Sequence, residues 1–260
     1  MTPAQSLALA ASAFGAGAMN AMAGGGTILT FPTLMFLGMP AVAANATSTV
    51  ALLPGAAASM AGFRREVAAN RGWLRALFLP CLLGGMVGSV LLLRTPEKIF
   101  QHLAPVLILF ATILFMLRGV LAKRLSPRTD GASELSSLPP GRWLTAALLQ
   151  FAVAVYGGYF GAGIGILMLA LLGFLGLTDI HAMNGLKNFF NLCINGVAAA
   201  YFVLQGAVSW PEAAVLAVGA ALGGYGGAGF SRRIGQEKAR AAVVVIGLLV
   251  TVLLAWQQFR

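Results

Sequence analysis

One lysine interrupts an otherwise apolar stretch at residues 183–191, and four asparagines share its side of the expected helix. The five residues follow i, i+3, i+4, i+7 and i+11 spacing, which places them on one helical face. They are Asn184, Lys187, Asn188, Asn191 and Asn195. Ammonium and carboxamide groups donate hydrogen bonds to anion oxygens, and a bound anion offsets the cost of desolvating an ammonium. The stripe therefore predicts an anion site with Lys187 as counter-charge, the alternative being hydrogen bonds that only join helices.

Two glycine clusters predict a second source of anion-binding groups. They are Gly24, Gly25 and Gly26 in the first half of the chain and Gly161, Gly163 and Gly165 in the second. Each glycine inside a helix costs about 1 kcal/mol relative to alanine, so the helix is expected to break at these clusters. A helix that starts after a break presents free backbone N–H groups and the positive end of its dipole, and both attract anions. Both clusters are therefore candidate substrate-binding segments.

Polar side chains also follow the first glycine cluster. Asn45, Thr47 and Ser48 stand in an apolar stretch of the first half, where the second half has Asn184 and Lys187. A polar group on a membrane helix faces the protein interior or a water-filled path, because lipid offers it no partner. We expect these side chains to supply further donors to the same anion.

The remaining reactive residues form no catalytic or metal-binding pattern. Asp179 precedes the helix of Lys187 and is expected to be its N-cap. His181 is a candidate proton relay, with a simple interfacial position as the alternative. Cys81 and Cys193 lie in apolar segments without CxxC spacing, which is typical of packing residues. HExxH and GxSxG motifs are absent from the sequence, so we expect no enzyme, no cofactor and no metal site.

The chain around these residues has the composition of a membrane protein. Of its 260 residues, 59% are apolar and 9% are charged, against about 25% charged residues in soluble domains. Residues 1–63 and 143–178 contain no Asp, Glu, Lys or Arg, and about 20 apolar residues suffice for one spanning helix. The net charge of +10 lies mainly in short loops, as orientation in a bilayer requires, so nucleic-acid binding is not expected. The composition predicts an all-α polytopic membrane protein.

The sequence repeats weakly at a spacing of about 138 residues. Ile28 matches Ile166, Phe36 matches Phe174, and Gly38 matches Gly176. We therefore expect two homologous transmembrane repeats, residues 1–121 and 143–260, joined by a linker at 122–142. Each repeat has four apolar segments: 5–37, 41–63, 73–93 and 99–121 in the first, then 143–177, 180–204, 211–230 and 240–259 in the second.

The leading segment of each repeat is too long for one crossing. As one helix it would measure about 50 Å, against a bilayer core of about 30 Å. Because a glycine cluster lies near its middle, we expect a full span followed by a short half-helix that turns back. The chain then has eight main segments, or ten if each leading segment is counted as two.

The basic residues favour an inverted arrangement of the two repeats. If each leading segment crosses and returns, thirteen basic residues fall on one face: Arg64, Arg65, Arg71, Arg75, Arg118, Lys123, Arg124, Arg128, Arg142, Arg232, Arg233, Lys238 and Arg240. The other face keeps three, Arg94, Lys98 and Arg260. This asymmetry predicts that the basic loops are cytoplasmic and that both termini are outside. Inverted repeats with broken helices at the midplane are a common transporter design.

Other glycines have small-xxx-small spacing. They are Gly84 and Gly88, Gly157 and Gly161, and Gly219, Gly223 and Gly227. Such spacing lets two helix backbones approach closely. It predicts tight helix packing within the chain or in a homodimer.

Two stretches resemble a known family. "GAGAMNAMAGGGTILTFPTLMFLGMPAVAANATSTVAL", residues 15–52, is similar to the first repeat of the sulfite exporter TauE/SafE family, and "YGGYFGAGIGILMLALLGFLGLTDIHAMNGLKNFFNLCINGVAAAYF", residues 156–202, resembles its second repeat. The resemblance implies a multi-pass protein of the bacterial inner membrane that transports sulfite, sulfonates or related small anions. The family's motif positions fall on Gly24, Gly25, Gly26, Thr47, Ser48, Gly161, Gly163, Gly165, Asn184, Lys187 and Asn188.

Taken together, the residues and the resemblance predict a secondary transporter, working as an exporter of small anions. The site is expected at the midplane, between the two repeats. An anion channel would use the same donors without alternating access and is the first alternative. A membrane assembly protein that transports nothing is the second.

Overall fold

The computed structural model describes residues 2–22, 25–124, 140–234 and 236–258. Eleven α-helices account for all the regular structure in these ranges. They are α1 (Pro3–Met22), α2 (Thr27–Phe36), α3 (Ala41–Gly62), α4 (Arg64–Ala69), α5 (Arg71–Arg94), α6 (Glu97–Arg124), α7 (Pro140–Tyr159), α8 (Ile164–Phe174), α9 (Ile180–Leu204), α10 (Trp210–Ile234) and α11 (Gln236–Gln258). The all-α prediction is confirmed, and most of the expected linker lies outside the described residues.

Both leading segments break at their glycine clusters, as predicted. Segment 5–37 forms α1 and the 10-residue α2, and segment 143–177 forms α7 and the 11-residue α8. The two short helices also end alike. Gly38 and Gly176 have φ of 90° and 98°, and in each case the next N–H donates to a carbonyl five residues back, at 3.1 Å. This left-handed cap suits glycine, and it recurs at the spacing of the sequence repeat.

A short helix, α4, stands where the sequence suggested only a basic loop. It begins directly after α3, and Arg64 and Arg65 are exposed in its first turn while Val67 is buried. The turn also contains Glu66, and an acidic side chain stabilises a helix start. The α4 helix packs against α9, so the connection between α3 and α5 is a packed element.

The helices pair across the two halves of the chain. The most extensive contacts join α1 to α10 and α7 to α5. In both pairs a glycine permits the approach: a Cβ on Gly223 would lie 1.9 Å from the carbonyl oxygen of Phe14, and one on Gly88 would lie 2.1 Å from that of Val155. The predicted close packing is confirmed at these positions, and it occurs within the chain. A homodimer stays a prediction.

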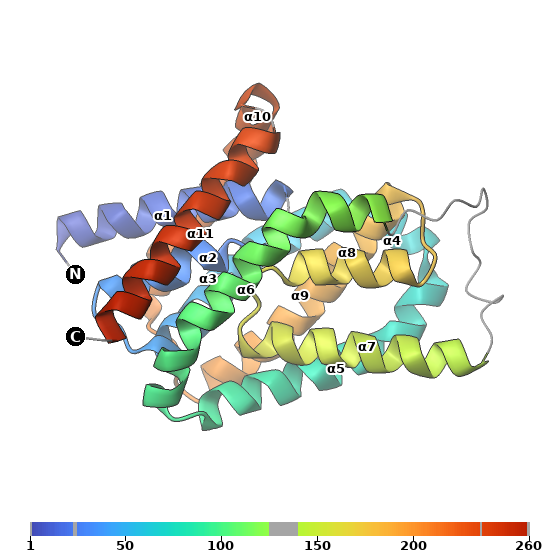
Figure 1. The fold of residues 1–260 in the computed structure, drawn as a ribbon, viewed down its shortest axis with the longest axis horizontal. Helices are drawn as coiled ribbons and strands as arrows, with labels where there is room; N and C mark the ends of the chain where they lie inside the picture. Colours follow the sequence, from blue (N-terminus) through green and yellow to red (C-terminus); the bar gives the residue numbers. More distant parts are fainter. Residues whose placement is uncertain (1, 23–24, 125–139, 235, 259–260) are drawn as a thin grey trace.

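The two ends of the molecule carry different elements. The start of α1 and the end of α11 lie at one end, and α4 lies at the other end, with the end of α6 and the start of α7 (Figure 1). We call these the terminal end and the linker end. In this view α1 runs from the terminal end toward the linker end, whereas α7 runs the opposite way.

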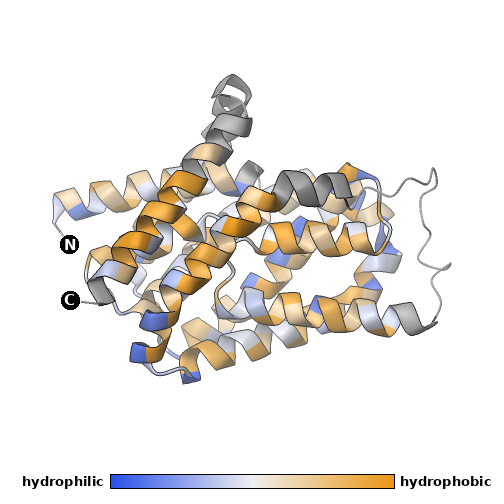
Figure 2. Ribbon diagram, in the orientation of Figure 1, coloured by the Kyte–Doolittle hydropathy of each residue, from blue (hydrophilic) through white to orange (hydrophobic). Residues whose placement is uncertain are grey.

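The outer surface is apolar. Three helical stretches are long and apolar enough to cross a membrane, Ala41–Gly62, Arg71–Arg94 and Glu97–Leu117, and shorter apolar helices accompany them. Large apolar side chains such as Leu79, Val106 and Leu144 are more than half exposed. Figure 2 shows hydrophobic residues along the helices and hydrophilic residues mostly near helix ends. This distribution is that of a polytopic membrane protein.

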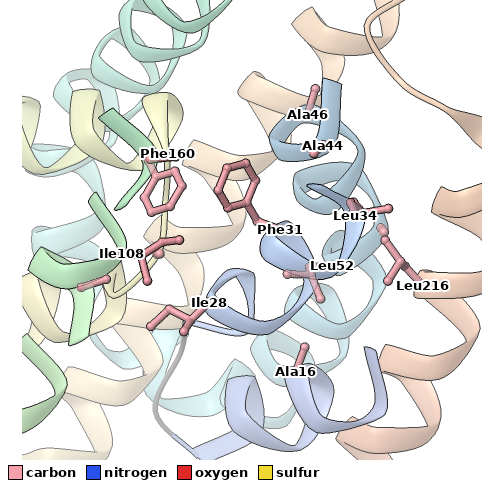
Figure 3. Packing of buried hydrophobic residues seen from close by; sticks show 14 of the residues in the cluster. Ala16, Ile28, Phe31, Leu34, Ala44, Ala46, Leu52, Ile108, Phe160 and Leu216 are labelled. Carbon is pink, nitrogen blue, oxygen red and sulfur yellow. The ribbon is translucent and has the colours of Figure 1, made fainter. Parts of the chain in front are cut away.

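The centre of the molecule is packed with apolar and aromatic side chains. Phe31 of α2 and Phe160, just after α7, point toward each other (Figure 3), with ring centroids 5.3 Å apart in an edge-to-face arrangement. Phe100 of α6 contacts both rings. All three side chains are buried. They join elements of both halves of the chain beside the helix breaks.

Candidate functional site

The two glycine breaks meet inside the protein. Gly25 and Gly163 have φ of 105° and 76°, values that L side chains rarely adopt. A Cβ on Gly25 would lie 3.3 Å from the backbone nitrogen of Gly163 and 2.7 Å from the ring of Phe115. Gly161 also has a positive φ, of 78°, and Gly165 is buried in the first turn of α8. Gly24 lies outside the described residues.

Two helices therefore begin next to each other. The N-cap of α2 is Gly26 and that of α8 is Gly163, so neither N-cap residue supplies a capping side chain. Asn20 Oδ1 accepts a hydrogen bond from the Gly26 N–H at 2.8 Å. From this point α2 runs toward the terminal end and α8 toward the linker end (Figure 1). Each helix start is equivalent to about half a positive charge. Two such starts in contact make a region that favours an anion.

The hydroxyl groups of Thr47 and Ser48 are buried and hydrogen-bonded. Ser48 Oγ lies 2.6 Å from Thr30 Oγ1 of α2, and Thr47 Oγ1 accepts a hydrogen bond from the backbone N–H of Ser209 at 3.0 Å. These bonds join α3 to α2 and to the segment before α10. An anion that bound these hydroxyls would have to exchange with the present partners.

Asn45 of α3 connects to the end of α7, beside the second glycine break. Its side chain is 1% exposed, and its Nδ2 donates to the carbonyl oxygen of Tyr159, the last residue of α7, at 3.0 Å. Its Oδ1 has no hydrogen-bond partner among the described residues. Tyr159 lies two residues before Gly161.

Lys187 is buried toward the linker end of α9. It is 5% exposed, and its Nζ donates to Asn184 Oδ1 at 3.2 Å. The neighbouring Gly185 faces α4, since a Cβ there would lie 3.0 Å from the Cβ of Glu66. Lys187 precedes Asn195 by eight residues, about 12 Å along the helix axis. The ammonium reaches back to Asn184 and so points away from the glycine breaks.

Asn195, at the other end of the polar stripe, does reach the second glycine break. Asn195 Oδ1 lies 3.7 Å from the position that a Cβ on Gly161 would take. The Nδ2 of Asn195 donates to both the backbone oxygen and the Oδ1 of Asn191, each at 2.8 Å. Asn188 is half-buried between the two ends. The stripe thus runs from the linker end of α9 to the centre of the molecule.

Residues 9–254 match the family described as "Sulfite exporter TauE/SafE". The chain belongs to this family. A "Probable membrane transporter protein" of Haemophilus influenzae is 29% identical, over 94% of this chain and 92% of its own length. "Probable membrane transporter protein YfcA" of Escherichia coli K12 is 26% identical, over 91% of this chain and 84% of its own length. "Probable membrane transporter protein ORF9" of a Sinorhizobium species is 23% identical, over 93% of this chain and 88% of its own length. The protein is therefore a membrane transporter and not an enzyme.

The other residues singled out in the TauE/SafE chain lie at the start of α9 and in α5. Asp179 Oδ1 accepts from the backbone N–H of His181 at 2.8 Å, which confirms the predicted N-cap. The side chain of His181 is exposed. Cys81 is buried, and its thiol lies 3.4 Å from the carbonyl oxygen of Phe190. The described residues contain no cluster of His, Cys, Asp and Glu that would hold a metal ion.

A cavity of about 440 Å³ opens near the terminal end, and sequence reasoning missed it. It lies where α1, α2, α3 and α10 approach one another, and its polar lining includes Gln5, Ser209 and Glu212. Ser209 Oγ donates to the Glu212 carboxylate, and the backbone of Ser209 holds Thr47. No local motif marks these residues, because a serine and a glutamate at the start of a helix ordinarily serve as a cap.

Proposed function

We propose that this TauE/SafE protein is a secondary transporter that exports small oxyanions, such as sulfite or organosulfonates, across the bacterial inner membrane. The adjacent starts of α2 and α8 carry the proposal, because each repeat contributes one positive helix end to the same point. An intracellular anion is already driven outward by a negative-inside potential, so export requires no coupling ion.

In this proposal Lys187 and its neighbours form the first binding site that an anion meets along the pathway. The ammonium is buried near α4, whose Arg64 and Arg65 are exposed at the linker end. Cationic side chains at the mouth of a pathway raise the local concentration of anions. In this proposal an anion enters at the linker end, meets Lys187, Asn184 and Asn188, and passes to the glycine breaks. The donors there are the first N–H groups of α2 and α8, with Asn45, Thr47 and Ser48 beside them.

We infer that the two halves, residues 1–121 and 143–260, are inverted repeats joined by a linker at 122–142. The opposite directions of α1 and α7 in Figure 1 support this arrangement. The exchange of helix pairs supports it too, since α1 packs on α10 as α7 packs on α5. The basic loops at the linker end are then cytoplasmic, and the two repeats rock against each other around the central site. In this proposal His181 lies at the cytoplasmic mouth, where it can exchange protons with water.

Anion-induced thermal stabilisation tests the proposal. The full-length protein is heated with sulfite, sulfate, ethanesulfonate or acetate, in parallel with Lys187→Met and the exposed control Lys98→Met. A ligand that binds the folded state at one hundred times its Kd stabilises it by about 2.7 kcal/mol. We expect at least one oxyanion to raise the Tm of wild type and Lys98→Met, and Lys187→Met to lose most of the shift.

Flux in proteoliposomes distinguishes a transporter from a channel. We expect oxyanion efflux that saturates with concentration and falls at least tenfold in Lys187→Met. Flux that rises without saturation would favour an anion channel. A wild-type protein that neither binds nor transports any of the four anions would refute the proposal.

A further inference from the structure

The side-chain oxygen of Asn45 is a buried acceptor with no donor. Within the described part of the chain no group donates to Oδ1, and the side chain is 1% exposed. The amide orientation is determined by its surroundings, because Nδ2 faces the Tyr159 carbonyl oxygen at 3.0 Å and a flip would place two oxygens in contact. Leaving such a buried acceptor unsatisfied destabilises the folded state, because its desolvation is not compensated. A ligand that supplies positive charge to Oδ1 would recover this free energy.

In the second repeat, the side-chain oxygen at the position equivalent to Asn45 has a cationic partner. Asn45 is the fifth residue after the N-cap Pro40, and Asn184 is the fifth after the N-cap Asp179. Asn184 Oδ1 accepts a hydrogen bond from the Lys187 ammonium at 3.2 Å. The residue that corresponds to Lys187 is Ser48, and its hydroxyl lies against Thr30 instead. The second repeat therefore holds a covalently attached cation where the first repeat has only an open acceptor.

The end of α7, which the Asn45 side chain contacts, presents further oxygens. The carbonyl oxygen of Tyr159 accepts a hydrogen bond from Asn45 Nδ2 at 3.0 Å. Two residues further on, a Cβ on Gly161 would lie 3.0 Å from the Gly157 carbonyl oxygen and 3.7 Å from Asn195 Oδ1. The carbonyl end of a helix is equivalent to about half a negative charge. Neutral carbonyl and carboxamide oxygens suit hard cations rather than transition metals, and the set contains no carboxylate to balance a divalent ion.

We propose that these oxygens form a binding site for a small monovalent cation, with Na⁺ as the ion. The ligands are Asn45 Oδ1, Asn195 Oδ1 and the terminal carbonyls of α7, and the ion stands where Lys187 places its ammonium in the second repeat. Half-helix carbonyl ends serve this purpose in transporters with broken helices. Occupancy is a property of the protein alone, whereas a role in anion transport rests on the function proposed above.

Occupancy of this site would be linked to anion binding. The site adjoins Gly161, and the anion-favouring helix start is at Gly163, so the two ligands attract each other. By linkage, Na⁺ then raises anion affinity by the same factor as the anion raises Na⁺ affinity. A 1:1 complex of Na⁺ with a monovalent anion carries no net charge, so the membrane potential would drive only the cation-free anion outward.

Thermal unfolding without any substrate anion tests the site. The full-length protein is heated in NaCl, KCl or N-methylglucamine chloride at constant ionic strength, with wild type compared to Asn45→Leu, Ser48→Lys and the distant control Asn70→Leu. We expect the Tm of wild type and Asn70→Leu to rise with Na⁺ and to saturate. The Na⁺ midpoint should increase at least tenfold in Asn45→Leu. Ser48→Lys introduces the ammonium of the second repeat, and its Tm should not depend on Na⁺.

Equal Tm values in all three salts would overturn the proposal, as would an unchanged Na⁺ response in Asn45→Leu or Ser48→Lys. If Asn45→Leu does not fold, Ser48→Lys still decides the question, since it adds a donor without removing one of the proposed ligands. Because no transported anion is present, a Na⁺ response can persist even if every oxyanion fails to bind. Failure of the cation site and failure of the anion transporter are therefore separate results.

Discussion

Replacing Gly88 by alanine should separate α5 from α7. The added Cβ would lie 2.1 Å from the carbonyl oxygen of Val155 and 2.8 Å from the backbone nitrogen of Tyr159. Both neighbours are backbone atoms, so no side chain can rotate away. Carbon and oxygen need more than 3 Å, and the two helices must therefore move apart locally by about 1 Å.

The free-energy cost of Gly88→Ala can be compared with that of the same substitution at a glycine that has free space around it. Overpacking of this kind costs about 1–3 kcal/mol, and a clash with a rigid backbone belongs at the upper end. Alanine returns about 1 kcal/mol through its helix propensity, so Gly88→Ala should lose about 1–2 kcal/mol. At Gly55 an added Cβ meets nothing within 4 Å, so Gly55→Ala should be neutral or stabilising.

Thermal and SDS-induced unfolding of the purified protein measure this difference. We expect a lower Tm for Gly88→Ala than for wild type, and no loss for Gly55→Ala. Shortening Val155 to alanine should not rescue the first variant, because the clash is with the backbone oxygen. A Gly88→Ala protein as stable as Gly55→Ala, or a Tm restored by Val155→Ala, would refute the backbone clash.

Three further predictions concern single contacts. Glu97 accepts hydrogen bonds from two backbone N–H groups at the start of α3. Glu97→Gln should therefore lower the stability measured by thermal unfolding, and Glu97→Ala should lower it further, by about 0.5–2 kcal/mol. Equal Tm values for the variants and wild type would contradict this. Gly163 has φ of 76° with ordinary space around it. Gly163→Ala should therefore lower the free energy of unfolding by about 1–2 kcal/mol, and Gly163→Asn should lower it less, since asparagine tolerates this conformation. The reverse order would show that side-chain space, not backbone conformation, determines the loss of stability. Phe31 is fully buried between two aromatic rings, so Phe31→Ala should cost about 3–5 kcal/mol, while Phe36→Ala at a 45% exposed position of the same helix should change the Tm little.

The features that follow from the sequence are those decided by a few neighbouring residues. The glycine clusters predicted where the leading segments break, and α1–α2 and α7–α8 separate there. Asp179 was recognisable as an N-cap because capping depends only on the first turn of its own helix. Glu97 was not, since it caps α3 from another helix 55 residues away in the chain.

The candidate site shows the same division. The i, i+3, i+4 pattern placed Lys187 and Asn195 on one face of α9, yet it did not show that the two lie at different depths relative to the glycine breaks. It also gave no sign that the Asn45 carboxamide reaches Tyr159 in the other half of the chain. Glu212 and Ser209 carried no signal, because only the approach of α1, α2 and α3 makes them line a cavity.

Composition, uncharged runs and glycine clusters by themselves determined the membrane class, the broken segments and the polar stripe. These properties follow from the cost of burying charge in lipid and from local backbone freedom, which act along the chain. Only the tertiary structure decided that the starts of α2 and α8 meet, and that α1 packs on α10 while α7 packs on α5. Many apolar helices of similar hydrophobicity can pair in a bilayer, and close steric fit between backbones selects among them.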